Sequence, residues 1–284
     1  MERLAIENLD ADTLYETPQG CTHFLSLQGE CLVWRVVQKR DYTPKPGKRG
    51  EVQGFSDASR FRMLKMVSGI DWQEAGRCHF ITLTYPDHYY GIDKQWLKLH
   101  RELFWQYFER HVGHEVSGIW RTEWKPRKTG KWIGHIMPHH HIICFREKYV
   151  WKWDVRDLWE SAIGWREYVD VNVKRMRNQK QVGYYVAKYA AKSDCLLGIA
   201  SYRSKFPPGR AWGRFRIDRF PSANIQEIQL SEDRALEAYR GNCRHGKPAI
   251  DIWGNRGFTV LGPQAVDIFL KLFRIEVAGG QCLW

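Results

Sequence analysis

The alternation of hydrophobic and polar residues predicts a series of strands and helices in the middle of the chain. The segment CHFITLTY (78–85) alternates as a half-buried strand does, and it stops at Pro86. After Asp93, apolar residues recur every three or four positions, which is the spacing of a helix that packs one face on a sheet. Two further strands, 116–124 and 135–145, are separated by polar residues and are predicted to pair as a hairpin.

Strands and helices continue to alternate after this hairpin. The pattern predicts a helix over 154–163, a strand over 168–173 and a helix over 178–192. Because the hairpin makes the sheet antiparallel at that point, we predict the α+β class, with a central antiparallel β-sheet flanked by helices. Extra elements are expected at both the N-terminal and the C-terminal end.

This pattern divides the chain into three parts. Residues 77–220 carry the predicted sheet and form the central domain. Residues 1–76 are expected to form a strand-and-helix extension that packs on it. Residues 221–284 are expected to form a helical extension, with helices over 231–239 and 264–277.

Composition and charge indicate a polyanionic partner. The chain of 284 residues has 44 Lys and Arg against 32 Asp and Glu, a formal net charge of +12. No uninterrupted apolar stretch is long enough to span a membrane, and the acidic start lacks the features of a signal peptide, so we expect a cytoplasmic protein without a membrane partner. The 7 Cys include no C-x-x-C pair, which argues against a disulfide scaffold or a structural zinc site.

Three consecutive histidines lie in the segment PHHHIICF (138–145) and suggest a metal site. Successive side chains of a strand point to opposite faces, so His139 and His141 share a face and His140 points away. The preceding strand offers Glu123, which the hairpin would bring beside them. Two imidazoles and a carboxylate suit a divalent ion that also holds a phosphate oxygen, although an exposed surface cluster is the alternative.

A second candidate site lies in the segment YYVAKYAAK (184–192) of a predicted helix. At about 100° per residue, four side chains fall on one face: Tyr185, Tyr189, Lys188 and Lys192. Tyr184 lies about a quarter turn away from that face. A tyrosine oxygen acts as a covalent nucleophile when neighbouring ammonium groups stabilise its anion. The alternative is a Tyr/Ala face packed on the sheet with solvated lysines.

These motifs resemble those of the HUH endonucleases, specifically the rolling-circle replication initiators of phages and plasmids. PHHHIICF resembles their His-hydrophobic-His strand, with His140 at the position of a bulky apolar residue. YVAKYAAK resembles the tyrosine helix of the two-tyrosine branch, similar to microvirus gene A proteins. FITLTYPD (80–87) resembles the first motif of the family, and PGRAWGRF (208–215) resembles a basic-aromatic segment of phage-type members. The motifs occur in the order of the family.

The resemblance implies both a fold and an activity. It implies a nuclease domain over 77–220 that binds Mg²⁺ or Mn²⁺ and nicks one strand at a replication origin. A tyrosine would become joined to the DNA 5′ phosphate, and the free 3′ hydroxyl would prime synthesis. Two alternatives remain open: a single-tyrosine relaxase or transposase, and a non-catalytic DNA-binding protein with a structural metal site.

The distribution of charge indicates where DNA binds. Residues 174–219 contain twelve Lys or Arg and two Asp, a local charge of +10, interleaved with aromatic residues. Phosphates attract the charges and unpaired bases stack on aromatic rings, so we expect single-stranded or hairpin origin DNA. The predicted DNA-binding residues are Lys174, Arg175, Arg177, Lys180, Arg203, Lys205, Arg210, Trp212, Arg214 and Arg216.

One segment resembles a nucleotide-binding loop but breaks its pattern. GNCRHGK (241–247) fits the spacing of a P-loop, yet Pro248 stands where Ser or Thr would bind Mg²⁺. Proline also lacks the backbone N–H that such a loop presents to phosphate. We therefore expect a separate helicase of a bacterial host cell to unwind the duplex.

Overall fold

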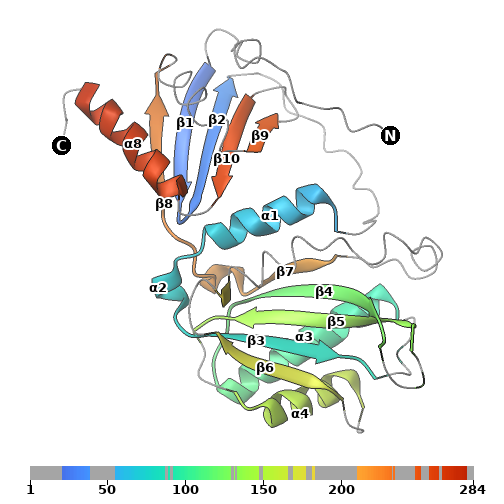
Figure 1. Cartoon of the computed structure of the whole chain (residues 1–284). Helices are drawn as coiled ribbons and strands as arrows, with labels where there is room; N and C mark the ends of the chain where they lie inside the picture. The colour runs from blue at the N-terminus through green and yellow to red at the C-terminus, as the bar shows by residue number, and fades with distance from the viewer. Residues whose placement is uncertain are drawn as a thin grey trace, which may run out of the picture. The chain divides into compact units, whose positions relative to one another are not determined.

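The chain forms two compact units, each built on an antiparallel sheet (Figure 1). The computed structural model describes residues 21–38, 55–86, 89, 92–128, 131, 133–146, 150–165, 169–176, 181–182, 210–231, 233, 247–250, 256–261 and 264–279. One unit comprises Met1–Gly47, Ser68–Ile70 and Ser222–Trp284, and the other Lys48–Val67 and Asp71–Pro221. The predicted α+β class, with a central antiparallel sheet, is confirmed.

The unit of residues Lys48–Val67 and Asp71–Pro221 carries the sheet with the strand order β6-β3-β5-β4-β7. Its strands are β3 (Cys78–Thr84), β4 (Gly118–Pro126), β5 (Ile136–Cys144), β6 (Val171–Met176) and β7 (Trp212–Phe215). β4 and β5 pair as the predicted hairpin, and β5 lies at the centre of the sheet. The strand predicted over 168–173 is present, but it runs three residues later than its pattern indicated.

Two long helices, α3 (Lys94–Val112) and α4 (Lys152–Ile163), pack on this sheet (Figure 1). The Asp93 side chain caps α3 by accepting a hydrogen bond from the N–H of Gln95, and Gly113 ends the helix at φ 81°, a conformation that glycine adopts without strain. The buried face of α3 includes Phe104 and Phe108. The helix predicted after Asp93 is therefore confirmed.

Shorter helices connect the longer elements. They are α1 (Asp57–Ser68), α2 (Trp72–Ala75) and a 3₁₀ helix, η3 (Ile217–Arg219). The Asp71 carboxylate caps α2 by accepting hydrogen bonds from the N–H groups of Gln73 and Glu74. The helix predicted over 154–163 corresponds to α4, whereas the predicted 178–192 helix lies almost entirely outside the described residues.

The other unit pairs strands from both ends of the chain, in the order β8-β1-β2-β10-β9. Its elements are β1 (Cys21–Gln28), β2 (Cys31–Gln38), β8 (Ile225–Leu230), β9 (Lys247–Ile250), β10 (Arg256–Leu261) and the helix α8 (Gln264–Gly279). Its apolar core includes Leu25, Trp34 and Phe269. The helix predicted over 264–277 is present as α8, but the pattern did not predict strands after residue 221. Almost all of the predicted 231–239 helix lies outside the described residues, and the three-part division stays a prediction.

The described helices include none that is long and apolar enough to cross a membrane.

Candidate active site

The β4–β5 hairpin brings the three predicted metal ligands to one face of the sheet. Glu123 on β4 pairs directly with His139 on β5, and Arg121 pairs with His141. Because side chains two positions apart share a face, Glu123, His139 and His141 project on the same side. The Nε2 atom of His141 lies 3.1 Å from Oε2 of Glu123. Both of these side chains are buried.

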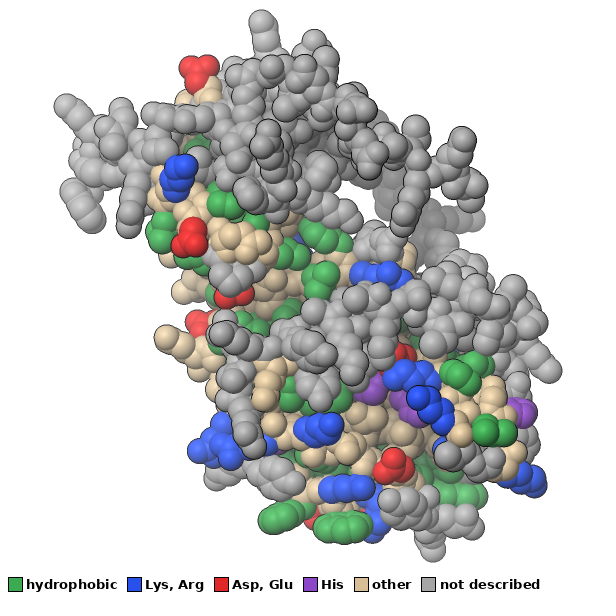
Figure 2. Space-filling model, in the orientation of Figure 1, with side chains coloured by type: hydrophobic (Ala, Val, Ile, Leu, Met, Phe, Trp, Pro, Cys, Tyr) green, Lys and Arg blue, Asp and Glu red, His purple; other side chains and the backbone are tan. Residues whose placement is uncertain are grey.

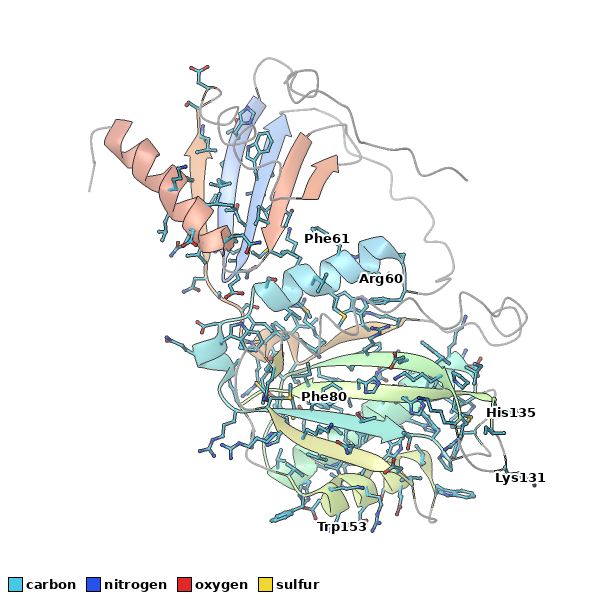
Figure 3. The ribbon with its side chains drawn as sticks, in the orientation of Figure 1. Arg60, Phe61, Phe80, Lys131, His135 and Trp153 are labelled. Atoms are coloured by element: carbon cyan, nitrogen blue, oxygen red, sulfur yellow. The ribbon has the colours of Figure 1, made fainter. Side chains whose placement is uncertain are left out.

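Neighbouring side chains hold His141 and Glu123 in place. The Nδ1 atom of His141 is hydrogen-bonded to the hydroxyl of Thr82 at 3.1 Å, so both ring nitrogens have partners. The Phe80 ring on β3 stacks on the His141 imidazole at 5.5 Å between centroids (Figure 3). The Lys125 ammonium donates to Oε2 of Glu123 at 2.5 Å. A metal-binding histidine is commonly oriented by a partner of this kind on its other nitrogen.

The surroundings favour the protonation states that bind metal ions. Burial lowers the pKa of His139 to about 3, and the nearby charges of His141 and Lys125 lower it further. Burial also lowers the pKa of His141, although Glu123 opposes this change. Burial would raise the pKa of Glu123, but hydrogen bonds from His141 and Lys125 outweigh it and hold that pKa well below its usual range. Neutral imidazoles and an ionised carboxylate are the forms that coordinate a cation.

The spacing of two donors fits a divalent ion. Adjacent ligands of an octahedral ion with bonds of about 2.1 Å are about 3.0 Å apart. The 3.1 Å between His141 Nε2 and Glu123 Oε2 matches that distance. Within the described residues, no three His, Cys, Asp or Glu side chains are already arranged around one metal position, so His139 would have to reorient to become the third ligand. Figure 2 shows histidine side chains bordered by lysine and arginine side chains.

On the opposite face of β5, His140 forms a buried hydrogen-bonded network that its sequence pattern did not predict. Its Nδ1 atom lies 2.9 Å from the hydroxyl of Thr122, the residue opposite it on β4, and its Nε2 atom lies 3.2 Å from the hydroxyl of Tyr85. The edge of the Trp159 ring faces the imidazole at 5.8 Å. The indole N–H of Trp159 donates to the carbonyl of Thr84 at 2.7 Å. The pairing of Thr122 with His140 follows from the hairpin register and was the available sequence signal.

Two further basic side chains are buried near this network. The Arg101 guanidinium lies 3.5 Å from the centroid of the Trp120 ring, and burial lowers the pKa of Arg101 to about 10. Burial lowers the pKa of His100 to about 4. Burial, and then the charge of Arg101, also lower the pKa of His140 well below its ordinary value. His140 is therefore neutral, and one ring nitrogen donates a hydrogen bond while the other accepts one.

The predicted nucleophiles and half of the predicted DNA-binding set fall in segments that the structure does not describe. The residues outside the described part are Tyr185, Tyr189, Lys188, Lys192, Arg177, Lys180, Arg203 and Lys205, together with Tyr184. Lys174 and Arg175 are exposed on β6, at one edge of the sheet. The sequence motif therefore remains the basis for the tyrosine assignment.

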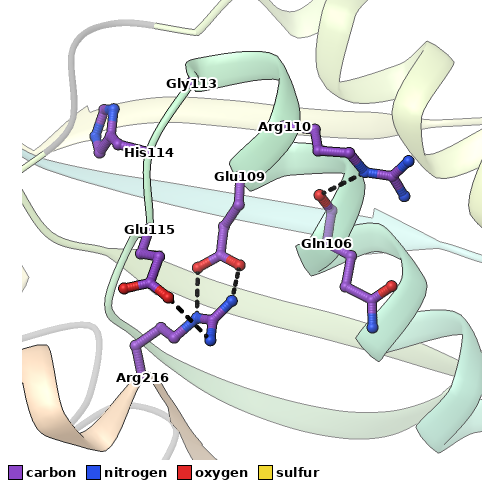
Figure 4. Close-up of a pocket in the computed structure, with 7 residues that line it drawn as sticks. All are labelled: Gln106, Glu109, Arg110, Gly113, His114, Glu115 and Arg216. Carbon is purple, nitrogen blue, oxygen red and sulfur yellow. Dashed lines mark hydrogen bonds and ion pairs between the residues drawn. The ribbon is translucent and has the colours of Figure 1, made fainter.

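The other predicted DNA-binding residues lie on or beside β7, and two of them make structural contacts. The Arg216 guanidinium pairs with both carboxylate oxygens of Glu109, at 2.8 and 2.6 Å, and with Glu115 at 3.3 Å (Figure 4). The indole N–H of Trp212 donates to the hydroxyl of Ser59 at 2.8 Å. Arg210 is exposed, and Arg214 lies 5.1 Å from the centroid of the Phe220 ring.

A separate pocket of about 600 Å³ lies at the C-terminal end of α3 (Figure 4). Its lining residues are Gln106, Glu109, Arg110, Gly113, His114, Glu115 and Arg216. The ion pairs between Arg216 and the two glutamates occupy the charges of this pocket. None of the candidate metal ligands lines it, so it is distinct from the face that carries His139 and His141.

Comparison with known proteins gives one family match. Residues 78–194 match the model of a family described as replication-associated protein, of the ORF2 type. The matched segment contains β3 to β6, the three candidate metal ligands and both predicted tyrosines. No curated protein and no solved structure matches the chain. The chain is thus similar to replication-associated proteins over this segment, which is consistent with a rolling-circle replication protein.

Proposed function

We propose that this chain is a replication initiator that nicks one strand of a phage or plasmid origin with a tyrosine and starts rolling-circle replication. One observation carries the proposal: Glu123, His139 and His141 share one face of the central hairpin, inside the segment that matches replication-associated proteins. A buried His-Glu pair beside exposed basic residues suits a phosphodiester substrate.

The residues of the hairpin would prepare this face for the phosphate. Neutral His139 and His141 and ionised Glu123 would hold a Mg²⁺ or Mn²⁺ ion, which supplies positive charge to the non-bridging phosphate oxygens. Thr82 keeps the His141 ring turned toward Glu123 through its hydrogen bond to Nδ1. Burial of His141 and Glu123 excludes water from the donors that face the phosphate.

In the proposed reaction, the hydroxyl oxygen of Tyr185 or Tyr189 attacks the phosphorus atom of the scissile diester. A tyrosine–phosphate ester forms, the bond between phosphorus and the 3′ oxygen breaks, and the 3′ oxygen takes up a proton. Lys188 and Lys192 would stabilise the tyrosine anion, as their spacing on the helix suggests. The second tyrosine would attack the regenerated site after a round of synthesis. Sequence spacing and the family match support this step.

The DNA would be a single strand or a hairpin of the origin, bound by the basic residues that flank the tyrosine helix. Exposed Lys174 and Arg175 on β6 are the described members of this set that lie immediately before the helix. A separate host helicase would unwind the duplex, and the reaction would take place in the cytoplasm of a bacterial cell.

Adduct formation on origin DNA tests the proposal. Labelled single strands from candidate origins are incubated with the protein and Mn²⁺ and run on a denaturing gel. We expect a covalent adduct that is lost in the double variant Tyr185→Phe/Tyr189→Phe and kept in the matched control Tyr184→Phe. Complete absence of an adduct across the candidate origins would refute the nuclease. If one single variant leaves both cleavage and strand transfer unchanged, the enzyme uses only the other tyrosine.

The histidines are tested with the same strand. His139→Ala and His141→Ala are expected to reduce cleavage much more than DNA binding, because their proposed role is at the reacting phosphate. Equal loss of cleavage and binding would indicate a structural metal site instead.

A further inference from the structure

One carboxylate oxygen in the candidate metal centre is shared by two neighbours. Oε2 of Glu123 lies 2.5 Å from the ammonium of Lys125 and 3.1 Å from Nε2 of His141. Lys125 follows Glu123 by two positions on β4, so its side chain leaves the same face of the sheet. A monovalent cation therefore already neutralises the only candidate ligand that carries a negative charge.

The Lys125 ammonium and a divalent ion would repel each other strongly on this oxygen. An ion bound to Oε2 at about 2.1 Å would lie no farther than about 4.6 Å from an ammonium 2.5 Å from the same oxygen. Even with the dielectric constant of water, this repulsion corresponds to a loss of metal affinity of about tenfold. Metal binding is thus opposed as long as Lys125 keeps its contact with Glu123.

Lys125 can leave the carboxylate, whereas the neighbouring cation on β4 is fixed. The Lys125 side chain is 35% exposed and lies near the end of the strand, so its flexible stem can carry the ammonium into water. Arg121 precedes Glu123 by two residues and is buried at 2% exposure. Its guanidinium lies 4.4 Å from the centroid of the Phe55 ring. Only Lys125 of these two can exchange between the carboxylate and solvent.

We propose that Lys125 is a resident counter-cation of the metal centre: its ammonium neutralises Glu123 until a divalent ion displaces it, and it thereby limits the affinity for free metal. The inference rests on the metal centre of the proposed function. Lys125 acts through Glu123 and is a positioning residue. It holds the carboxylate beside His141, at a spacing that already suits two ligands of one ion.

Direct measurement of Mn²⁺ binding to the full chain tests the role of Lys125. Free Mn²⁺ is followed by its electron paramagnetic resonance signal in titrations without DNA. Lys125→Met is expected to bind Mn²⁺ about tenfold more tightly than the wild-type chain, because the competing charge is gone. Lys125→Arg keeps the charge and should bind close to the wild-type level. Lys128→Met removes an exposed lysine three residues away and is the matched control, with no change expected.

The binding data separate this inference from the proposed function. If His141→Ala abolishes Mn²⁺ binding but Lys125→Met binds like the wild type or more weakly, the counter-cation role is wrong and the metal centre stands. A merely structural role of Lys125 would produce that weaker binding together with lower thermal stability. If the gain in Lys125→Met persists after His141→Ala is added, the ion binds elsewhere and the inference fails. Absence of Mn²⁺ binding in all variants would overturn both the inference and the metal centre.

Discussion

Replacement of His140 by leucine should destabilise the unit that carries the central sheet, even though the HUH endonucleases that the motif resembles have a bulky apolar residue at this position. His140 is fully buried, with Thr122 and Tyr85 as hydrogen-bond partners at 2.9 and 3.2 Å. Leucine fills similar space but offers no partner to either hydroxyl. Both hydroxyls belong to side chains that are about 1% exposed, so water does not replace the lost contacts.

The size of the effect follows from two opposing contributions. A buried polar group left without a partner costs about 1–3 kcal/mol, and the change creates two of them. Full burial of a leucine side chain contributes about 1.5–3 kcal/mol in the opposite direction. We expect a net loss of about 1–3 kcal/mol in the free energy of unfolding of this unit. The triple variant His140→Leu/Thr122→Val/Tyr85→Phe should recover most of the loss, because it removes the unpaired hydroxyls as well.

Hydrogen exchange followed by mass spectrometry measures this effect locally. The protein has two compact units, so a single global unfolding transition would mix their contributions. Peptides that cover β4 and β5 report on the site-bearing unit, and their protection should fall about tenfold for each 1.4 kcal/mol lost. Peptides from β1 and β2 in the other unit are the internal control. Unchanged protection in His140→Leu, or a further loss in the triple variant, would refute the role of the network.

Two more predictions concern the same unit. Its stability should fall as the pH drops from about 6.5 toward 4, because His100 has a folded-state pKa of about 4 and His139 one of about 3, whereas the unfolded chain takes up these protons below the ordinary value of 6.5. Each such histidine contributes up to about 1.4 kcal/mol per pH unit, and a His100→Asn variant should show a shallower dependence in urea unfolding; an equally steep one would contradict the assignment. Gly118→Ala should cost about 1–3 kcal/mol, because a Cβ atom there would lie 2.8 Å from the carbonyl oxygen of Ile143 and 2.9 Å from the Trp105 ring. An unchanged urea midpoint would show that the strands can separate enough to admit the methyl group.

Local patterns predicted the elements that determine the site, because their signals lie within one strand, one helix or one hairpin. The alternation over 78–85 gave β3, the Asp93 cap and apolar stripe gave α3, and the polar break between two strands gave the β4–β5 hairpin. Once two strands pair as a hairpin, alternation alone places Glu123 on the face of His139.

Long-range pairings had no such local signal. Strand β1 pairs with β8, so that His23 lies opposite Leu230, and no pattern in either strand encodes a partner about two hundred residues away. The ion pair between Arg216 and Glu109 likewise joins β7's flank to α3. The positive charge of Arg216 suggested DNA, because sequence shows a charge but not the carboxylate that neutralises it.

The run of three histidines makes the register of β5 a specific problem, which the His140 network solves. A slip of one residue would exchange the two faces of the strand, and it would still present a histidine toward Glu123. The metal-binding face alone therefore discriminates weakly between the two registers. The contacts of His140 with Thr122 and Tyr85 are lost in the slipped register, and two buried hydroxyls would remain unpaired. His140 thus favours the pairing in which His139 stands opposite Glu123, and the stability of one face of β5 secures the chemistry proposed for the other.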